Sequence, residues 1–267
     1  MKNITWIVQP DVFTEDQKEE TYLILRESGM KVTVVEPYFK EPATPFTDIM
    51  LRGSFGLVSW LNTEAIRKLG KMVINQDYWI PFSFAELPKY FNATLNDDIV
   101  WMTLPEAQKC LQVEGTMFVR PDSGKKTFSG QLFDYDKLST EIAFLQQRNI
   151  ETDFLVGVAK PKELNIEARF VIVDKKIISQ SVYSDRGSIS FLGEVPKKVT
   201  EFANECLNST AFPEPHFVLD LAETTNGIKV VEVNAIETSS YYNSDRKAIY
   251  QALQQALQEG KVTHLLS

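Results

Sequence analysis

Short apolar runs alternate with a longer polar stretch at the start of the chain. Residues 4–8 and 32–35 are apolar, and the segment between them, 14–28, is polar and periodic and ends at Gly29. An apolar run, a periodic segment closed by glycine and a second apolar run are typical of a β-α-β unit with parallel strands. The chain is therefore expected to open with a small α/β lobe.

This alternation continues to about residue 95. The next elements expected are a strand at 48–51, a helix from Asn62 or Thr63 to 69, and a strand at 72–74. The aromatic segment 76–91 is assigned to loops and a short helix. We therefore place an N-terminal α/β lobe at residues 1–95.

Beyond residue 95 the pattern predicts hairpins and single helices, which indicate antiparallel sheets. Thr103 and Glu106 have the spacing of a capping box that opens a helix through residue 111. The other elements expected are strands at 117–120, 130–133, 153–158, 165–173 and 176–183, helices at 136–148, 196–208 and 244–259, and a hairpin at 216–237. The expected fold class is α/β in the first third and α+β in the rest.

Composition is that of a folded, acidic protein. Of the 267 residues, 43% are hydrophobic and 24% are charged, which suffices for a sizeable core. The formal net charge of −8 disfavours attraction to nucleic acid or to an anionic membrane surface. Neither partner is expected, and nothing in the pattern sets an oligomeric state.

Cysteine and histidine are too sparse for a zinc site. The cysteines are Cys110 and Cys206 and the histidines are His216 and His264, with no CxxC spacing. The apolar run at the start is too short for a signal peptide, and no apolar stretch reaches about 18 residues. We expect a cytoplasmic protein with reduced thiols.

Polar and apolar side chains alternate along both strands of the hairpin expected at 216–237. A two-residue Asn226-Gly227 turn would pair Asp220 with an apolar position and mix the two faces. A three-residue loop, 225–227, pairs Asp220 with Glu232 and Leu221 with Val231, and it keeps one apolar face. We therefore predict the three-residue loop.

The polar face of this hairpin carries Asp220, Glu232 and Asn234. Two carboxylates that face each other repel, and a bound cation removes that repulsion. Oxygen ligands from Asp, Glu and Asn suit Mg²⁺, which completes its coordination with water and nucleotide phosphates. The alternative is a solvent-facing hairpin with ordinary surface charges.

A basic loop joins the strands expected at 117–120 and 130–133. It lacks the first glycine of a Walker loop, and a strand rather than a helix follows it. Its backbone N–H groups are still able to cover phosphates, while Arg120 and Lys126 balance the negative charge. A basic loop that binds no ligand is the alternative.

Taken in order over residues 115–245, these features resemble the ATP-grasp superfamily, and most closely its phage and bacterial clade named for one arginine and two lysines. They are Val119-Arg120-Pro121, Lys126-x-Phe128-x-Gly130, Glu167-x-Arg169, and Asp220 followed by Glu232-x-Asn234. The resemblance implies an ATP-grasp domain at 96–267, with two antiparallel-sheet subdomains that hold ATP between them and a subdomain boundary near 155–160.

The resemblance also implies roles for single residues. The implied catalytic residues are Arg120, in place of the phosphate-binding lysine of many ATP-grasp enzymes, Lys126 on the covering loop, and Arg169 near the phosphates or the acceptor. The implied nucleotide contacts include the backbone of Val156, Gly157, Val158 and Ala159 at adenine and the Glu167 carboxylate at the ribose. The implied Mg²⁺ ligands are Asp220, Glu232 and Asn234.

Some assignments stay open. Many ligases of the superfamily carry an arginine two residues before the metal-binding Asp, where this chain has Val218, so Arg169 or Arg186 takes that role or the protein is weakly active. Lys125 and Lys109 are both candidates for the clade's second lysine. Glu167 and Arg169 are also suitably spaced for a simple ion pair.

The implied activity is that of an ATP- and Mg²⁺-dependent carboxylate–amine ligase that acts through an acylphosphate. Its acceptor would be an amino acid, a peptide or a protein, and Tyr241 and Tyr242 would either border that acceptor or pack at a helix entrance. The alternatives are an ATP-grasp kinase that stops after phosphoryl transfer and a nucleotide-binding regulatory protein without turnover.

Overall fold

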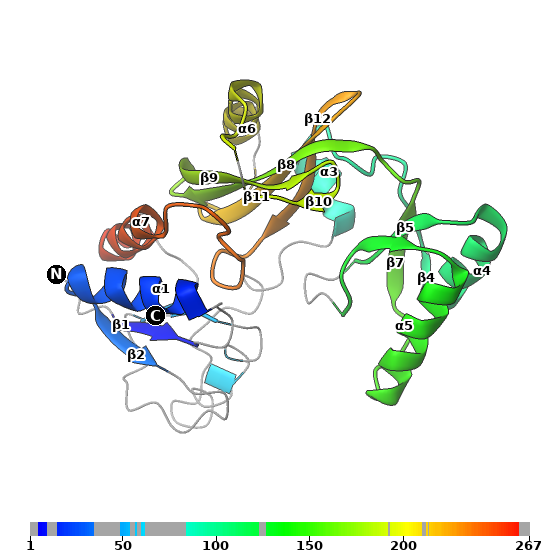
Figure 1. Ribbon diagram of the computed structural model, residues 1–267, viewed down its shortest axis with the longest axis horizontal. Coiled ribbons are helices and arrows are strands. Elements are labelled where there is room, and N and C mark those ends of the chain that lie inside the picture. The colour runs from blue at the N-terminus through cyan, green and yellow to red at the C-terminus, as the bar shows by residue number, and fades with distance from the viewer. Residues whose placement is uncertain are drawn as a thin grey trace.

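The computed structural model describes residues 5–9, 15–34, 49–53, 57, 60–61, 84–122, 127–191, 193–209, 212 and 214–261. Within these residues the strands form three sheets, which follow one another along the long axis of the molecule (Figure 1). The helix expected at 62–69, the strand expected at 72–74, and Lys125, Lys126 and His264 lie outside the described residues.

The first sheet is the expected parallel α/β unit. Strand β1 (Thr5–Val8), helix α1 (Glu15–Glu27) and strand β2 (Lys31–Val34) follow in order, and β3 (Ile49–Arg52) joins the other side of β1. Both neighbours run parallel to β1. Gly29 has a φ of 69°, a left-handed conformation that glycine adopts without steric cost after a helix.

The second sheet has four antiparallel strands in the order β4-β7-β5-β6. Its elements are β4 (Val100–Thr103), α4 (Leu104–Glu114), β5 (Met117–Pro121), β6 (Gln131–Phe133), α5 (Tyr135–Gln147) and β7 (Leu155–Ala159). Glu106 accepts a hydrogen bond of 2.8 Å from the Thr103 N–H, which confirms the capping box. Strand β4 was not expected from the sequence.

The third sheet has five antiparallel strands in the order β10-β9-β8-β11-β12. Its elements are β8 (Leu164–Val173), β9 (Lys176–Asp185), β10 (Ser188–Ile189), α6 (Lys197–Ser209), β11 (Phe217–Thr224), β12 (Gly227–Asn234) and α7 (Arg246–Gln258). Asp174 and Lys175 both have positive φ, as the tight turn between β8 and β9 requires.

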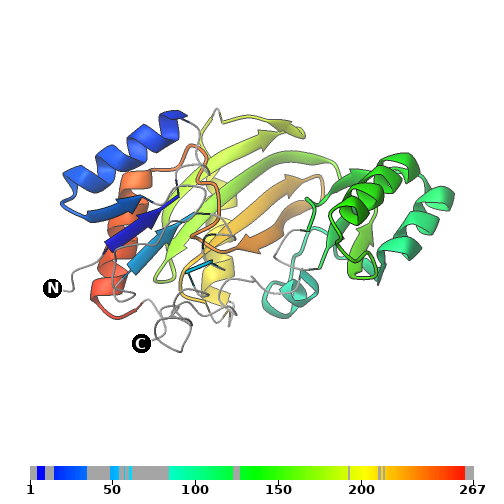
Figure 2. The ribbon, with the colours of Figure 1, turned by 90° about the horizontal axis from the view of Figure 1, so that it is seen from below.

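The third sheet is buried on both faces, which places it at the centre of the molecule (Figures 1 and 2). One face packs against α7 and the first lobe, where the Trp6 and Tyr250 rings meet edge-on at 5.0 Å. The other face packs against α6 and against the short helices η3 (Phe84–Glu86) and α3 (Leu87–Tyr90). Residues 84–91, which were assigned to the first lobe, therefore pack on the five-stranded sheet. The predicted domain boundary at residue 95 stays a prediction.

The β11–β12 hairpin reaches the expected pairing by a different route. Asp220 lies opposite Glu232, but the turn has two residues, Thr225 and Asn226, so the predicted three-residue loop is wrong. The extra residue is Val231, which forms a bulge, and Leu221 therefore pairs with Val230 instead. The Thr224 hydroxyl stabilises the shorter turn, because it accepts from the Asn226 N–H and donates to the Gly227 carbonyl.

The two cysteine thiols differ in burial. Cys206 lies in the core beneath the third sheet, and burial, together with the nearby Glu205 charge, raises its pKa to about 12. Since the thiolate is the reactive form, an aromatic disulfide reagent at pH 8 should label the partly exposed Cys110 and leave Cys206 unmodified until the protein unfolds. Native Cys110→Ser protein should then show almost no fast labelling, whereas fast labelling of that variant would contradict this arrangement.

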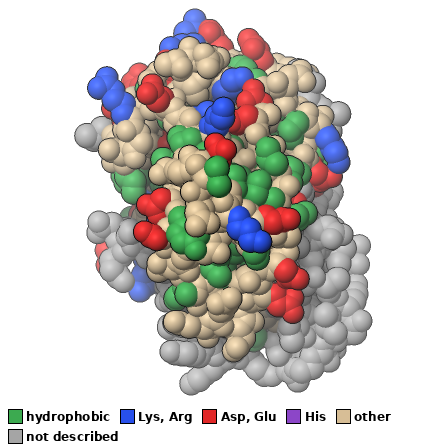
Figure 3. Space-filling model, turned by 90° about the vertical axis from the view of Figure 1, so that its right-hand side faces the viewer, with side chains coloured by type: hydrophobic (Ala, Val, Ile, Leu, Met, Phe, Trp, Pro, Cys, Tyr) green, Lys and Arg blue, Asp and Glu red, His purple; other side chains and the backbone are tan. Residues whose placement is uncertain are grey.

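Basic side chains are dispersed over the face that carries the four-stranded unit. Figure 3 views this face, where basic, acidic and hydrophobic side chains are interspersed and no single basic patch is visible. Of the described helices, none is long and apolar enough to cross a membrane.

Candidate active site

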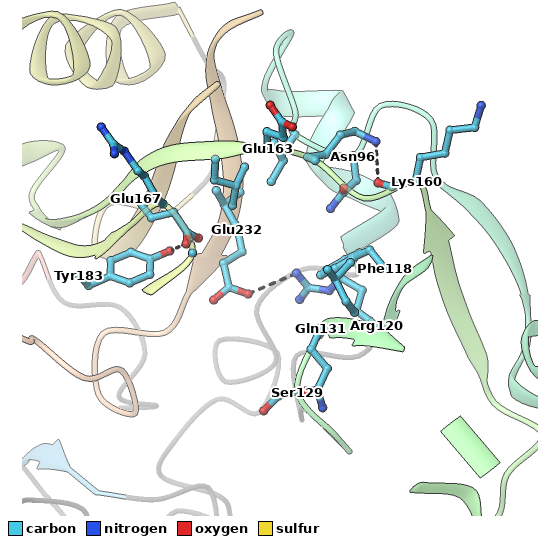
Figure 4. A pocket seen from close by; sticks show the side chains of 18 of the residues that line it. Asn96, Phe118, Arg120, Ser129, Gln131, Lys160, Glu163, Glu167, Tyr183 and Glu232 are labelled. Carbon is cyan, nitrogen blue, oxygen red and sulfur yellow. Dashed lines mark hydrogen bonds and ion pairs between the residues drawn. The ribbon is translucent and has the colours of Figure 1, made fainter. Parts of the chain in front are cut away.

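A cavity of about 800 Å³ lies between the four-stranded and five-stranded sheets (Figure 4). Ligand pockets typically have volumes of about 300–1,000 Å³. The polar and charged residues that line this cavity come from both sheets and from the segments between them. They are Asn96, Arg120, Ser129, Gln131, Lys160, Lys162, Glu163, Asn165, Glu167, Tyr183, Arg186 and Glu232.

Arg120 and Glu232 face each other across this cavity. Arg120 lies on β5 and Glu232 on β12, and the Arg120 Nη1 is 3.3 Å from the Glu232 Oε2 (Figure 4). Burial lowers the pKa of Arg120, and the charge of Glu232 opposes that change. The Arg120 Nε is buried and has no hydrogen-bond partner among the described residues. A buried donor without a partner is often explained by a water or ion that is bound there.

Arg169 neutralises the most deeply buried carboxylate of the site. Its Nε and Nη2 donate to the two oxygens of Asp220 at 2.8 and 2.6 Å, and its Nη1 donates to the Ser240 carbonyl at 2.7 Å. Asp220 is 1% exposed and lies directly across from Arg169 in the β8–β11 pair. Although burial acts to lower the pKa of Arg169, the charge and hydrogen bonds of Asp220 raise it above its ordinary value.

Asp220, Glu232 and Asn234 form one cluster, as the sequence predicts. The Asn234 Nδ2 donates to the Glu232 Oε1 at 2.8 Å and lies 3.4 Å from the Asp220 Oδ2. Arg169 and Arg120 balance the two carboxylates, a role that was expected of a bound cation. Among the described residues, no group of three His, Cys, Asp or Glu side chains is placed to hold a metal ion.

Glu167 lines the cavity and bonds to a tyrosine. The Tyr183 hydroxyl donates to the Glu167 Oε2 at 3.1 Å (Figure 4). Burial and the charges of Asp220 and Glu167 raise the pKa of Tyr183 well above its ordinary value, so the phenol stays protonated. The alternative ion pair between Glu167 and Arg169 does not form, because Arg169 bonds to Asp220 instead.

The segment expected at adenine lies inside the four-stranded sheet. This segment, Val156–Ala159, belongs to β7, which pairs with β5 on one side and with β4 on the other. None of these four residues lines the cavity. The cavity is lined instead by the residues that follow, Lys160 and Lys162–Asn165. The first of these is fixed by Asp98, whose carboxylate accepts from the Lys160 N–H and from the Lys162 Nζ. This loop was not predicted from the sequence.

The family described as "ATP-grasp domain, R2K clade family 3" matches residues 86–253. This chain belongs to that ATP-grasp family. The matched residues include the whole of the four-stranded and five-stranded sheets. The predicted ATP-grasp superfamily and two-subdomain fold are thereby confirmed.

Solved structures similar to this ATP-grasp chain share its fold at low sequence identity. D-cycloserine synthetase DcsG is 12% identical, with a TM-score of 0.62 over 97% of this chain and 100% of that one. D-alanine–D-alanine ligase from Bacillus anthracis is 15% identical, with a TM-score of 0.54 over 96% and 99%. The ATP-grasp ligase PsnB, complexed with a minimal precursor, is 15% identical, with a TM-score of 0.53 over 97% and 99%. A comparison with curated proteins found no match.

Val218, where the resemblance implies an arginine in many ligases, is fully buried in the core beside the first lobe. Of the two arginines considered as replacements, Arg169 lies within the carboxylate cluster, whereas the Arg186 side chain is 88% exposed at the cavity rim. Lys126 and Lys125 lie outside the described residues, and Lys109 on α4 does not line the cavity.

The Tyr242 ring lies over Arg169 beside the carboxylate cluster of this ATP-grasp chain. Its ring centroid is 4.6 Å from the Arg169 Cζ, and the ring stacks with those of Tyr183 and Phe191 at centroid distances of 4.9 and 5.6 Å. Its φ of 49° is left-handed, a strained conformation for an aromatic residue. Tyr241, in contrast, is buried in the core against Tyr250, so of the two tyrosines only Tyr242 contacts the site.

Gly130, directly before β6, has no room for a side chain. A Cβ at this position would lie 2.9 Å from the Arg120 Cβ and 3.0 Å from the Phe118 Cζ, both on β5. Because the Arg120 Cβ is fixed to the backbone, we expect Gly130→Ala to displace Arg120 and to weaken ADP binding about tenfold, in line with overpacking costs of about 1–3 kcal/mol. Calorimetric titration would show this, and unchanged ADP affinity would contradict it.

Proposed function

We propose that the protein is an ATP- and Mg²⁺-dependent carboxylate–amine ligase that acts through an acylphosphate. The observation that carries the proposal is the meeting of Arg120, Arg169, Asp220, Glu232 and Asn234 beside one cavity between two ATP-grasp subdomains. Phosphoryl transfer depends on positioning and on the stabilisation of negative charge rather than on covalent help from the protein. A cluster of two arginines and two carboxylates beside a nucleotide-sized cavity suits that chemistry.

ATP would occupy the cavity that Figure 4 shows. Arg120, with its unsatisfied Nε, would contact a phosphate, and the Glu167 carboxylate would accept from the ribose hydroxyls next to Tyr183. We place adenine against the backbone of residues 160–163 instead of the paired strand β7, because that loop lines the cavity. Lys126, outside the described residues, keeps its expected role on the covering loop.

The donor set fits Mg²⁺. The Asn234 amide lies within hydrogen-bonding distance of both the Asp220 and the Glu232 carboxylate, and oxygen donors of these three types suit this ion. The Asn234 amide now presents its nitrogen to both carboxylates, and a rotation of that amide would present its oxygen instead. When bound there, Mg²⁺ would neutralise phosphate charge and act as a Lewis acid at the transferring phosphoryl group.

The proposed reaction has two steps. A carboxylate oxygen of the substrate attacks the γ-phosphorus of ATP, the bond to the bridging oxygen breaks, and ADP leaves. The amine then attacks the acyl carbon, an amide forms, and phosphate leaves with its oxygen while the amine loses a proton. Arg120 would stabilise the charge on the phosphoryl oxygens, and Arg169 would supply the positive charge that Val218 cannot provide.

The acceptor is proposed to be an amino acid, a peptide or a protein. Similar solved structures include a D-alanine–D-alanine ligase and an ATP-grasp ligase in complex with ADP and a leader and core peptide, so both small and peptide ligands occur on this fold. The segment around Tyr242 is proposed to border the acceptor, because it lies directly over Arg169.

A hydroxylamine trap tests the reaction with hydroxylamine in place of the natural amine. The protein would be incubated with Mg·ATP, hydroxylamine and a panel of amino acids and peptides, and hydroxamate, ADP and phosphate would be measured together. A ligase yields all three in equal amounts with its own carboxylate. ADP with a stable phosphorylated product and no hydroxamate would indicate a kinase, and ATP binding with no ADP from any carboxylate would indicate a regulatory protein.

A further inference from the structure

The Phe84 ring lies directly against the guanidinium of Arg120. The Arg120 Cζ is 3.8 Å from the centroid of that ring, the shortest arginine–aromatic distance among the described residues. The Arg120 side chain is only 11% exposed, so water screens this cation–π contact weakly. Phe84 itself is 6% exposed and does not line the cavity. Arg120 is the cavity-lining residue that its ring contacts.

Phe84 is held from several directions. Its N–H donates to the Asp122 carbonyl, and the next N–H, of Ala85, donates to the Asp122 Oδ1, both at 3.1 Å. Its ring meets the edge of Trp101 at 6.3 Å and packs in the core of the five-stranded sheet. A side chain held in this way provides a rigid surface for the guanidinium.

Arg120, which belongs to the four-stranded sheet, is therefore held by Glu232 on the five-stranded sheet and by Phe84 in η3, which packs against that sheet. Glu232 bonds to one of its nitrogens, and Phe84 packs against the guanidinium. If Phe84 were removed, only the hydrogen bond to Glu232 would remain of these two contacts. The guanidinium would then be free to rotate about that hydrogen bond.

This contact favours an arginine over a lysine at position 120. A planar guanidinium stacks on an aromatic face and still directs its N–H groups sideways, whereas an ammonium group has no plane to stack. A lysine at position 120 would lose that surface contact.

We infer that Phe84 is a positioning residue that holds Arg120 in place for a nucleotide phosphate and makes the site require arginine. The inference rests on the proposed ATP site. The inference extends that proposal, because it assigns a role to the segment that precedes the four-stranded sheet.

Calorimetry with Mg·ATP and with adenosine tests the inference. Phe84→Leu should weaken Mg·ATP binding about tenfold and leave adenosine binding unchanged, because adenosine has no phosphate. Phe84→Tyr should bind like the wild type, and Arg120→Lys should bind as weakly as Phe84→Leu. The matched control is Phe91→Leu, which removes the same apolar ring from the same core without a contact to Arg120.

A double-mutant cycle separates positioning from general loosening of the core. In an Arg120→Ala background, Phe84→Leu should cause no further loss of Mg·ATP affinity, since the residue through which it acts is gone. Equal losses in both backgrounds, or no loss in the wild-type background, would overturn the inference.

The position of Arg120 is also measurable without nucleotide. Ring current from Phe84 should shift the Arg120 Nε–H resonance upfield in the free protein, and Phe84→Leu should remove that shift. If folded wild type shows this shift but binds no Mg·ATP, the proposed nucleotide function fails and the contact is structural only. If the shift is absent, the positioning role is overturned even where ATP binds.

Discussion

Arg169→Met should lower the free energy of unfolding by about 3–5 kcal/mol, the usual cost of removing one partner of a buried ion pair. The expected loss is large because Asp220 is 1% exposed and both of its oxygens accept from Arg169. Without the guanidinium, a carboxylate would remain buried between two strands with its main counter-charge removed. Urea unfolding followed by circular dichroism would measure the change.

Two further variants make this measurement decisive. Asp220→Asn in the Arg169→Met background removes the buried charge and should recover about 1 kcal/mol or more. Arg186→Met removes an arginine whose side chain is 88% exposed and should change stability by less than about 0.5 kcal/mol. The account of this ion pair is wrong if Arg169→Met is as stable as Arg186→Met.

Arg120→Ala should slow ATP-dependent product formation on the order of a hundredfold, the typical effect of losing one preorganised donor at a developing charge. Arg120 lines the cavity and its Nε is unsatisfied, so its loss should act on the reaction more than on folding. The rate of hydroxamate formation, with the carboxylate found in the trapping experiment, is the quantity to compare.

The matched control for this variant is Arg148→Ala. Arg148 is exposed at the end of α5 and does not line the cavity, so its replacement should leave the rate within about twofold of the wild type. A full-rate Arg120→Ala enzyme would remove Arg120 from the reaction.

Much of the fold was readable from local signals. The hydrophobic period predicted β8, β9 and the closing helix α7, and the Thr103–Glu106 pair predicted the start of α4. Strand β10 was missed because two residues at a sheet edge are too few to leave a periodic signal. Strand β4 carries an apolar run, Val100-Trp101-Met102, comparable with the runs that predicted the four-residue strands β2 and β3, so its sequence did contain a strand signal.

The hairpin shows where sequence reasoning reaches its limit. Burial of one apolar face required Asp220 to lie opposite Glu232, and the structure confirms that pairing. The same pairing results from one extra residue in the loop or from one extra residue in a bulge, so the pattern alone could not place the bulge at Val231.

The site was predicted in part for a similar reason. Motif spacing brought Asp220, Glu232 and Asn234 together, but it did not show that Arg169 would bond to Asp220 across two strands. Nor did it reveal Phe84, which is far from Arg120 in sequence and meets it only through tertiary packing. A contact of that kind leaves no local pattern.

The nucleotide site is the central claim, and calorimetric titration with Mg·ATP of wild type and Glu232→Gln tests it most directly. Glu223→Gln is the matched control, because Glu223 lies on the same hairpin but bonds to Lys198 away from the cavity. We expect Mg²⁺-dependent binding by wild type and Glu223→Gln, and binding at least about tenfold weaker in Glu232→Gln, because Glu232 is a proposed Mg²⁺ ligand. Folded wild-type protein that binds no Mg·ATP would contradict the account.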